Sequence, residues 1–315
     1  MAEHPVIRAA AGLAIVLTQA AALPEPPPVP PVLLQAGAAL TIRFAKGDAW
    51  KPAPYTRFRN EILIDATIDG HPATVLIDNG AQVTLVDSGF ARDAGIALGP
   101  AGGAMVAGRG RLETQRTAPA TLAIAHMMSV EGPLVATDLA LLSRALGRRV
   151  DAVLGADVLD HVAVMVRPDT NRLAILNSGG ITAGAGATRI ALRDGNRVDA
   201  SVGGHALRLQ VDFGFNGTVR LTDAAWARVF PTGSAVTQGT QTNADGATRA
   251  TRAGRADLTL DGIRLSDAPI DSGFENGARA DGLLGNGLFA RWITILDVPG
   301  GELVLVPLPS AAQGT

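Results

Sequence analysis

The chain has 315 residues, an apolar fraction of 47%, a charged fraction of 18% and a formal net charge of −2. This balance allows a substantial hydrophobic core, and the lack of a basic excess argues against a nucleic-acid partner. There is no cysteine, which excludes disulfides, thiolate nucleophiles and cysteine-ligated metal sites. The 37 glycines and 19 prolines favour a protein of many short strands and turns.

The N-terminus carries the features of a targeting signal. His4 and Arg8 precede the apolar run 9–17, and residues 20–22 are alanines suited to cleavage. The run is shorter than the roughly 20 apolar residues of a spanning helix, and no later stretch is long and apolar enough, so no stable membrane insertion is expected. We therefore expect residues 1–23 to be a signal peptide of an exported protein, periplasmic or secreted. Residues 24–54, which include a proline-rich run, are expected to form an extended N-terminal segment or linker.

In the first half of the chain, a predicted strand at 61–68 turns at Asp69-Gly70, a strong two-residue hairpin signal. The return strand, 73–77, is almost continuously apolar, which is typical of a strand buried on both faces. It ends at Asp78, and Gly80 follows after one intervening residue. The next predicted elements are a strand at 83–86 and a short helical stretch at 87–94.

The second half repeats this order of elements. Segment 199–205 corresponds to 65–71, and Asp212 corresponds to Asp78, with the same offset of 134 residues (199 − 65 and 212 − 78). Gly203-Gly204 takes the place of the Asp-Gly turn and can adopt the same positive φ. Thr222 is a predicted helix N-cap after the strand at 218–221. The spacing indicates an internal duplication that forms two similar lobes.

Each half continues with a glycine-rich segment, 101–110 and 237–246, that is poor in strand formers. These segments are predicted to be hairpins, either over a cleft or free on the surface. A second matching pair, 151–159 and 281–289, has an offset of 130 (281 − 151) and precedes the last strands of each half. The predicted final strands are 162–166, 173–176, 292–296 and 303–306; the linker is 177–187; and the lobes are 55–178 and 188–308.

These residues resemble the retropepsin-like aspartyl protease family of the aspartic protease clan. The family pattern is an apolar strand, Asp-Thr/Ser-Gly-Ala/Ser, a second apolar strand, a flap, and then two apolar residues with a glycine. It is found here as 76–81 with 153–155, and as 210–214 with 283–285. The resemblance covers about residues 55–308. It implies an all-β, bilobal pepsin- or retropepsin-like fold with two homologous β-barrel-like lobes and an inter-lobe cleft, fused in one chain.

The resemblance implies that Asp78 and Asp212 are the catalytic dyad. Two carboxylates at hydrogen-bonding distance cannot both ionise cheaply, so the pair holds one proton, as is established for aspartic proteases. One carboxyl can then take a proton from water while the other polarises the scissile carbonyl. The implied protein is a monomeric aspartic endopeptidase that acts on peptides or unfolded protein, with no metal and no cofactor. The loop positions that support the dyad are Asn79, Gly80, Ala81, Phe213 and Gly214.

Three of the loop residues depart from the family pattern. The family has Thr or Ser between Asp and Gly, and the hydroxyls lock the two loops together; this chain has Asn79 and Phe213. Asparagine offers an altered hydrogen bond and phenylalanine offers none. Phe215 also replaces the small residue that follows the glycine. Two hypotheses stay open: an aspartic endopeptidase with impaired activity, and a catalytically degenerate protein that binds peptides or a partner.

The remaining polar residues of interest are predicted to be structural. His71 and His205 follow the hairpin turns, at the strand ends far from the aspartates, and are expected to be exposed. His126 and His161 lack the spacing of metal ligands. Asp151 and Asp281 are expected to hydrogen-bond backbone groups before a buried strand.

Overall fold

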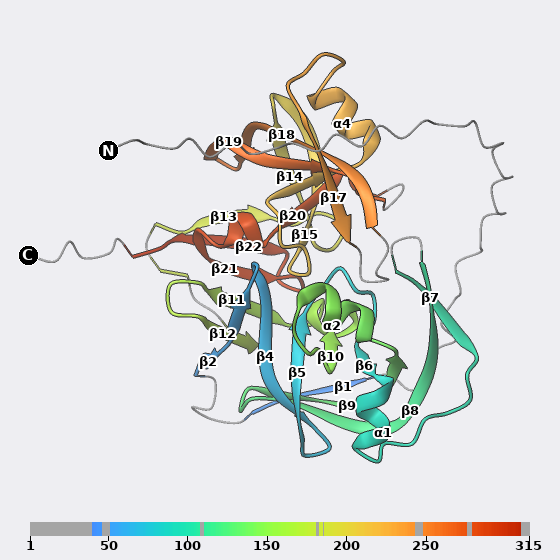
Figure 1. Ribbon diagram of the computed structural model, residues 1–315. Coiled ribbons are helices and arrows are strands. Elements are labelled where there is room, and N and C mark those ends of the chain that lie inside the picture. Colours follow the sequence, from blue (N-terminus) through green and yellow to red (C-terminus); the bar gives the residue numbers. More distant parts are fainter. Residues whose placement is uncertain are drawn as a thin grey trace, which may run out of the picture. The chain divides into compact units, whose positions relative to one another are not determined.

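The computed structural model describes residues 40–45, 51–107, 110–180, 183–184, 186–242, 248–275 and 279–309, all within one compact unit. The predicted signal peptide and most of segment 24–54 lie outside these residues. The fold is all-β and built from three sheets with five short helices (Figure 1). Among the described residues, no helix has the length and apolar character needed to cross a membrane.

A nine-stranded sheet forms the first lobe, in the order β1-β9-β6-β10-β5-β4-β8-β7, with β3 beside β4. At its centre β5 runs parallel to β10, and β10 runs antiparallel to β6. The strands are β1 (Thr41–Phe44), β3 (Thr56–Phe58), β4 (Glu61–Ile68), β5 (His71–Ile77), β6 (Leu85–Asp87), β7 (Gly103–Ala107), β8 (Gly110–Ile124), β9 (Met128–Thr137) and β10 (Ala152–Leu154). β1 therefore extends this sheet from within the segment that we predicted to be a linker.

A seven-stranded sheet forms the second lobe, in the order β14-β15-β20-β16-β19-β18-β17. Its centre repeats the first arrangement, because β15 is parallel to β20 and β20 is antiparallel to β16. The strands are β14 (Arg197–Val202), β15 (His205–Asp212), β16 (Val219–Leu221), β17 (Thr237–Thr242), β18 (Thr248–Leu260), β19 (Ile263–Ser272) and β20 (Gly282–Gly285).

The third sheet joins the two halves of the chain. It has six strands in the order β13-β22-β21-β11-β12-β2, and β11 pairs with β21 across the halves. These strands are β2 (Ala53–Pro54), β11 (Ala163–Arg167), β12 (Arg172–Leu176), β13 (Thr188–Ala191), β21 (Trp292–Asp297) and β22 (Glu302–Pro307). The sequence predicted four of these strands but not that they form a shared sheet.

The predicted turn and cap signals are confirmed. Asp69 and Gly70 both have positive φ, 49° and 82°, and Gly203 and Gly204 have 56° and 82°. Two different sequences therefore make the same type of turn. Thr222 caps its helix by accepting a hydrogen bond from Ala225 N at 3.2 Å. The helices are α1 (Ser88–Asp93), α2 (Ala140–Leu146), α3 (Ala156–Leu159), α4 (Asp223–Val229) and α5 (Asn286–Phe289).

The glycine-rich segments form hairpins, as predicted, and their arms are regular strands. β7 pairs with β8, and β17 pairs with β18 in register from Thr237 to Thr242. The long partner strands supply the backbone pairing that the glycines alone do not predict. Residues 108–109 and 243–247, between the arms, lie outside the described residues.

The strands that end in the two aspartates are at the centre of their lobes. In β5, Val75 and Ile77 are fully buried, and in β15 Leu209 and Val211 are fully buried. Neighbouring strands flank each of them on both sides, which explains the apolar run that precedes each Asp. Both aspartates are therefore attached to rigid elements.

Candidate active site

Asp78 and Asp212 lie at equivalent places in the two lobes. Asp78 directly follows β5, and its N–H donates to Leu154 O of β10 at 3.1 Å. Asp212 is the last residue of β15 and pairs with Gly285 of β20. Asp212 is buried and Asp78 is half-buried. Each carboxylate is thus delivered by a central strand that a parallel neighbour holds in place.

The structure brings the two carboxylates together over the glycines. A Cβ atom added to Gly80 would lie 2.7 Å from Asp212 Oδ2, and a Cβ atom added to Gly214 would overlap Asp78 Oδ1. Each carboxylate therefore lies against the loop backbone of the other lobe, in space that only glycine leaves free. The glycine of each Asp-x-Gly sequence therefore permits this close approach.

Backbone N–H groups hold each carboxylate. Asp78 Oδ1 accepts from Gly80 N at 2.9 Å and from Ala81 N at 3.2 Å. Asp212 Oδ1 accepts from Gly214 N at 2.8 Å. These bonds fix the rotamers of both side chains without another side chain, as a preorganised acid/base pair requires.

Both aspartates hold protons more tightly than a free aspartate does. Burial raises the pKa of Asp78, although the N–H groups of Gly80 and Ala81 oppose the rise. Burial, with the negative charge of Asp78, raises the pKa of Asp212 to about 7. The physical causes are desolvation and like-charge repulsion. The pair can therefore keep one proton at pH values well above those at which carboxylic acids usually ionise.

The Asn79 side chain connects the two loops. Its Nδ2 donates to Val211 O at 2.8 Å, and its Oδ1 accepts from Phe213 N at 2.7 Å. The side chain is 2% exposed. The phenylalanine side chain at position 213 makes no hydrogen bond to the first loop, so the connection comes from the asparagine alone of these two positions. A primary amide carries both a donor and an acceptor, so one side chain makes both bonds across the lobes.

Phe213 serves the core of the second lobe. Its side chain is fully buried and meets the ring of Phe289 edge to face, with centroids 5.6 Å apart. Its carbonyl accepts from Asn286 Nδ2 at 2.6 Å. The residue thus anchors the second loop by packing and through its backbone, while Asn79 bridges to it from the first lobe.

Phe215 fits because of a second change in the same loop. Its ring lies against Gly217, where an added Cβ would overlap the ring. The first lobe has the reverse combination at the matching positions, Ala81 and Val83 (215 − 134 and 217 − 134). The two loops therefore fill comparable space with the large residue at different positions, and Phe215 is compatible with the fold.

Two charged residues beside the dyad were not singled out from the sequence. Glu61, the first residue of β4, is 5% exposed and interacts electrostatically with both aspartates. Arg220 of β16 interacts with Asp212 and Glu61. Glu61 could have been found from the sequence. Residues equally far from a hairpin turn lie opposite each other, and positions 61 and 78 are equally far from the centre of the Asp69-Gly70 turn.

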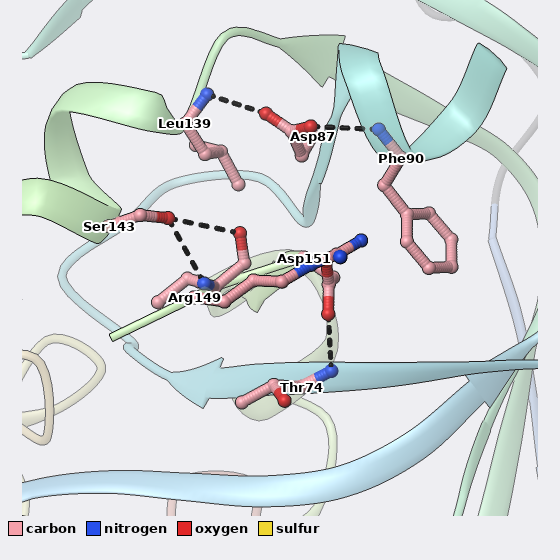
Figure 2. Close-up of polar contacts among 8 residues, drawn as sticks. Thr74, Asp87, Phe90, Leu139, Ser143, Arg149 and Asp151 are labelled. Atoms are coloured by element: carbon pink, nitrogen blue, oxygen red, sulfur yellow. Dashed lines mark hydrogen bonds and ion pairs between the residues drawn. The ribbon is translucent and has the colours of Figure 1, made fainter. Parts of the chain in front are cut away.

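The other predicted residues lie where a structural role requires. His71 and His205 are exposed at the hairpin turns. Asp281 Oδ2 accepts from Arg208 N at 2.9 Å, and Asp151 Oδ2 accepts from Thr74 N at the same distance (Figure 2). Both confirm the predicted backbone role, since each carboxylate ties the start of a central strand to its neighbour.

A pocket of about 740 Å³ lies in the first lobe near Asp151 and is lined in part by Asp87, Ser143 and Arg149. Asp87 Oδ1 accepts from Phe90 N, Asp87 Oδ2 accepts from Leu139 N, and Ser143 bonds to Val150 (Figure 2). These polar side chains of the pocket are thus already hydrogen-bonded to nearby backbone groups. Within the described ranges, no group of three or more His, Asp or Glu side chains could hold a metal ion.

Residues 64–161 match the family model described as "gag-polyprotein putative aspartyl protease". The matched segment begins in β4 and ends after α3, and it contains Asp78, Asn79 and Gly80. The second lobe lies outside it. No curated protein matches the chain.

Proposed function

We propose that the protein is an aspartic endopeptidase of the retropepsin-like family whose catalytic residues are Asp78 and Asp212, since residues 64–161 match the aspartyl protease model. The observation that carries the proposal is the crossed placement of the carboxylates, each against the glycine of the opposite loop. The raised pKa values of both acids support it, since a dyad must keep one proton to act as acid and base together.

The proposed reaction uses one water molecule and no covalent intermediate. The ionised carboxyl takes a proton from water, which attacks the scissile carbonyl carbon, while the protonated carboxyl donates a hydrogen bond to the carbonyl oxygen. The resulting diol collapses with proton transfer to the leaving nitrogen. The rigid loops, joined by Asn79, favour this geometry because acid/base catalysis tolerates little misplacement.

The proposed substrate is a peptide or an unfolded protein segment in extended form, added to the strands that border the site. The hairpins β7–β8 and β17–β18 are the proposed flaps. We further propose that the two lobes arose by internal duplication and that the protein acts as an exported monomer. The matching sheet centres and the 134-residue offset support the duplication.

The test is peptide hydrolysis by the wild type and by Asp→Asn variants. Unfolded casein or a peptide library is incubated from about pH 3 to pH 8, and new N-termini are quantified. Asp78→Asn and Asp212→Asn are each expected to lower turnover at least about 100-fold, the usual contribution of an acid/base group. Asp65→Asn is the matched control, because Asp65 is exposed on β4. A wild type that cleaves nothing across the range contradicts the proposal.

The alternative, a peptide-binding protein without catalysis, rests on the loss of both family hydroxyls at positions 79 and 213. It predicts peptide affinity that survives both Asp→Asn changes, with no turnover by any form. The bridge from Asn79 favours the enzyme, because it keeps the two loops connected from the first lobe.

A further inference from the structure

Two buried charged side chains border the dyad and have no part in the proposed reaction. Glu61 is 5% exposed, and its Oε2 has no hydrogen-bond partner. Arg220 Nε is also buried without a partner. Buried, unpaired ionisable atoms are costly, so a stable fold retains them mainly where they serve a site.

The hairpin register places Glu61 beside Asp78. Leu63 pairs with Leu76 at the end of the β4–β5 ladder, and continuing this register by two residues would bring position 61 near position 78, in line with the electrostatic effect of Asp78 on Glu61. Directly opposed residues in an antiparallel pair have Cβ atoms about 5 Å apart, so their side chains interact. Glu61 therefore approaches the dyad from the first lobe.

Arg220 approaches the same place from the second lobe. It is the central residue of β16, and its guanidinium lies over the ring of Phe215 at 4.3 Å. Asp271 of β19 is its register partner in the parallel pair. The acids that act on its charge are Asp271, Asp212 and Glu61.

The equivalent positions of the opposite lobes do not carry this pair of residues. The second-lobe counterpart of Glu61 is Gly195 (61 + 134), and the first-lobe counterpart of Arg220 is Val86 (220 − 134). One additional acid and one base thus reach the dyad from opposite lobes. The asymmetry argues against a role in the shared fold, since each lobe folds with one of the two residues missing.

We propose that Glu61 and Arg220 are positioning residues of the peptidase site, in which Glu61 is the third carboxyl of a cluster with Asp78 and Asp212, and Arg220 limits the negative charge of that cluster. The proposal rests on the proposed function and extends it. The charged groups that act on Glu61 are the two aspartates and Arg220.

The electrostatics of Glu61 agree with this placement. Burial and the charges of Asp78 and Asp212 raise the pKa of Glu61 to about 8, and Arg220 opposes the rise. In such a coupled cluster, the second negative charge is shared between Glu61 and the dyad. Arg220 also lowers the pKa of Asp212, so its charge opposes proton retention at both of these acids.

The test compares Glu61→Gln and Arg220→Met with the wild type in pH profiles of kcat/KM. Arg220→Met is expected to move the alkaline limb to higher pH, because Arg220 lowers the pKa of Asp212. Glu61→Gln is expected to move it much less, because Glu61 still holds its proton where Asp212 titrates. Glu131→Gln is the control, because Glu131 lies on β9, paired with Arg43. A purely structural role would lower stability in both variants without moving the limb in Arg220→Met. Unchanged limbs in both variants overturn the proposal.

Thermal unfolding from pH 4 to pH 9 gives a readout that does not need activity. Folded Glu61 keeps its proton up to about pH 8 while the unfolded chain loses it near pH 4.5, so the wild type loses stability as pH rises between these values. The Glu61→Gln variant is expected to lose less stability than the wild type over this pH range. If stability falls with pH equally steeply in both proteins, the three-carboxyl cluster is contradicted. If stability depends less on pH in Glu61→Gln than in the wild type, but the wild type cleaves nothing, the peptidase proposal fails and the three-carboxyl cluster stands.

Discussion

Asn79 connects the two loops from the first lobe only. The amide donates to Val211 O and accepts from Phe213 N, so both bonds between the loops come from the first lobe. The second lobe is then free to carry an apolar residue at position 213, which packs on Phe289. The connection between the lobes depends on the chemistry of the pair of positions rather than on either one alone.

Asn79→Ala is expected to destabilise the protein by about 2–4 kcal/mol, because it removes two buried hydrogen bonds and strands Phe213 N–H. Urea unfolding at fixed pH measures the change. The matched control is Asn196→Ala, since Asn196 Nδ2 also donates to Val211 O, at 3.2 Å, but makes that bond within its own lobe. We expect a loss of about 1 kcal/mol for the control. Equal losses in the two variants would argue against a special role for Asn79.

At the level of single residues, the sequence located the dyad but not its full surroundings. Asp78 and Asp212 were evident because each ends an apolar strand and the spacing repeats. Glu61 was missed because its counterpart is Gly195, and only residues shared by both halves were compared. The bridge from Asn79 could not be predicted either, because it depends on the rotamer of one side chain relative to a backbone 132 residues away.

In the two loops that follow Asp78 and Asp212, large and small residues exchange places. The second loop has Phe215 and Gly217 where the first has Ala81 and Val83. The Phe215 ring occupies the space next to Gly217, so each loop contains one large residue and one small one. Packing density, rather than identity at each position, is what the two lobes share.

A double-mutant cycle tests this exchange. Gly217→Val should cost about 1–3 kcal/mol by overpacking, and Phe215→Ala about 3–5 kcal/mol by leaving a cavity. The double variant restores the combination of the first lobe and should lose clearly less than the sum, with a coupling of about 1–3 kcal/mol. Gly102→Val is the control for β-branching, since an added Cβ there meets nothing within 4 Å. Additive losses would contradict the exchange.

At the level of elements, local signals were sufficient for the hairpins and insufficient for the sheet partners. The Asp-Gly and Gly-Gly turns fix strand ends through positive φ, which few other residue pairs adopt. The pairing of β11 with β21 joins apolar segments about 130 residues apart, and one apolar strand does not specify its neighbour. The hairpins β7–β8 and β17–β18 were predicted, but the strand character of their arms was not, because it comes from the pairing with the partner strands.

For the molecule as a whole, the buried acids link stability to pH. The folded protein keeps protons on Asp78 and Asp212 at pH values where the unfolded chain has released them. Stability contributed by protonated Asp212 is therefore present at about pH 4 and is lost as pH rises toward about 7, the folded pKa. A salt-bridged carboxylate has the opposite effect, because the stability that it contributes is lost as the pH falls.

We expect the unfolding free energy of the wild type to fall between pH 4 and pH 7 by up to about 1.4 kcal/mol per pH unit for each retained proton. Asp212→Asn should fall less steeply over this range, because the amide does not ionise. Denaturant unfolding at a series of pH values measures both slopes, with Asp65→Asn as the exposed control. A wild type that gains stability from pH 4 to pH 7 would show that the aspartates are not held as neutral acids.

The continuous ladder through β11 and β21 means that the two acids meet within one molecule, with no encounter step at each assembly. Half of the chain expressed by itself would present β11 or β21 as an open edge with a row of free N–H and C=O groups. Such an edge recruits strands from other chains, so an isolated half would be prone to aggregate. The pairing of β11 with β21 therefore also covers an edge that each half would otherwise expose.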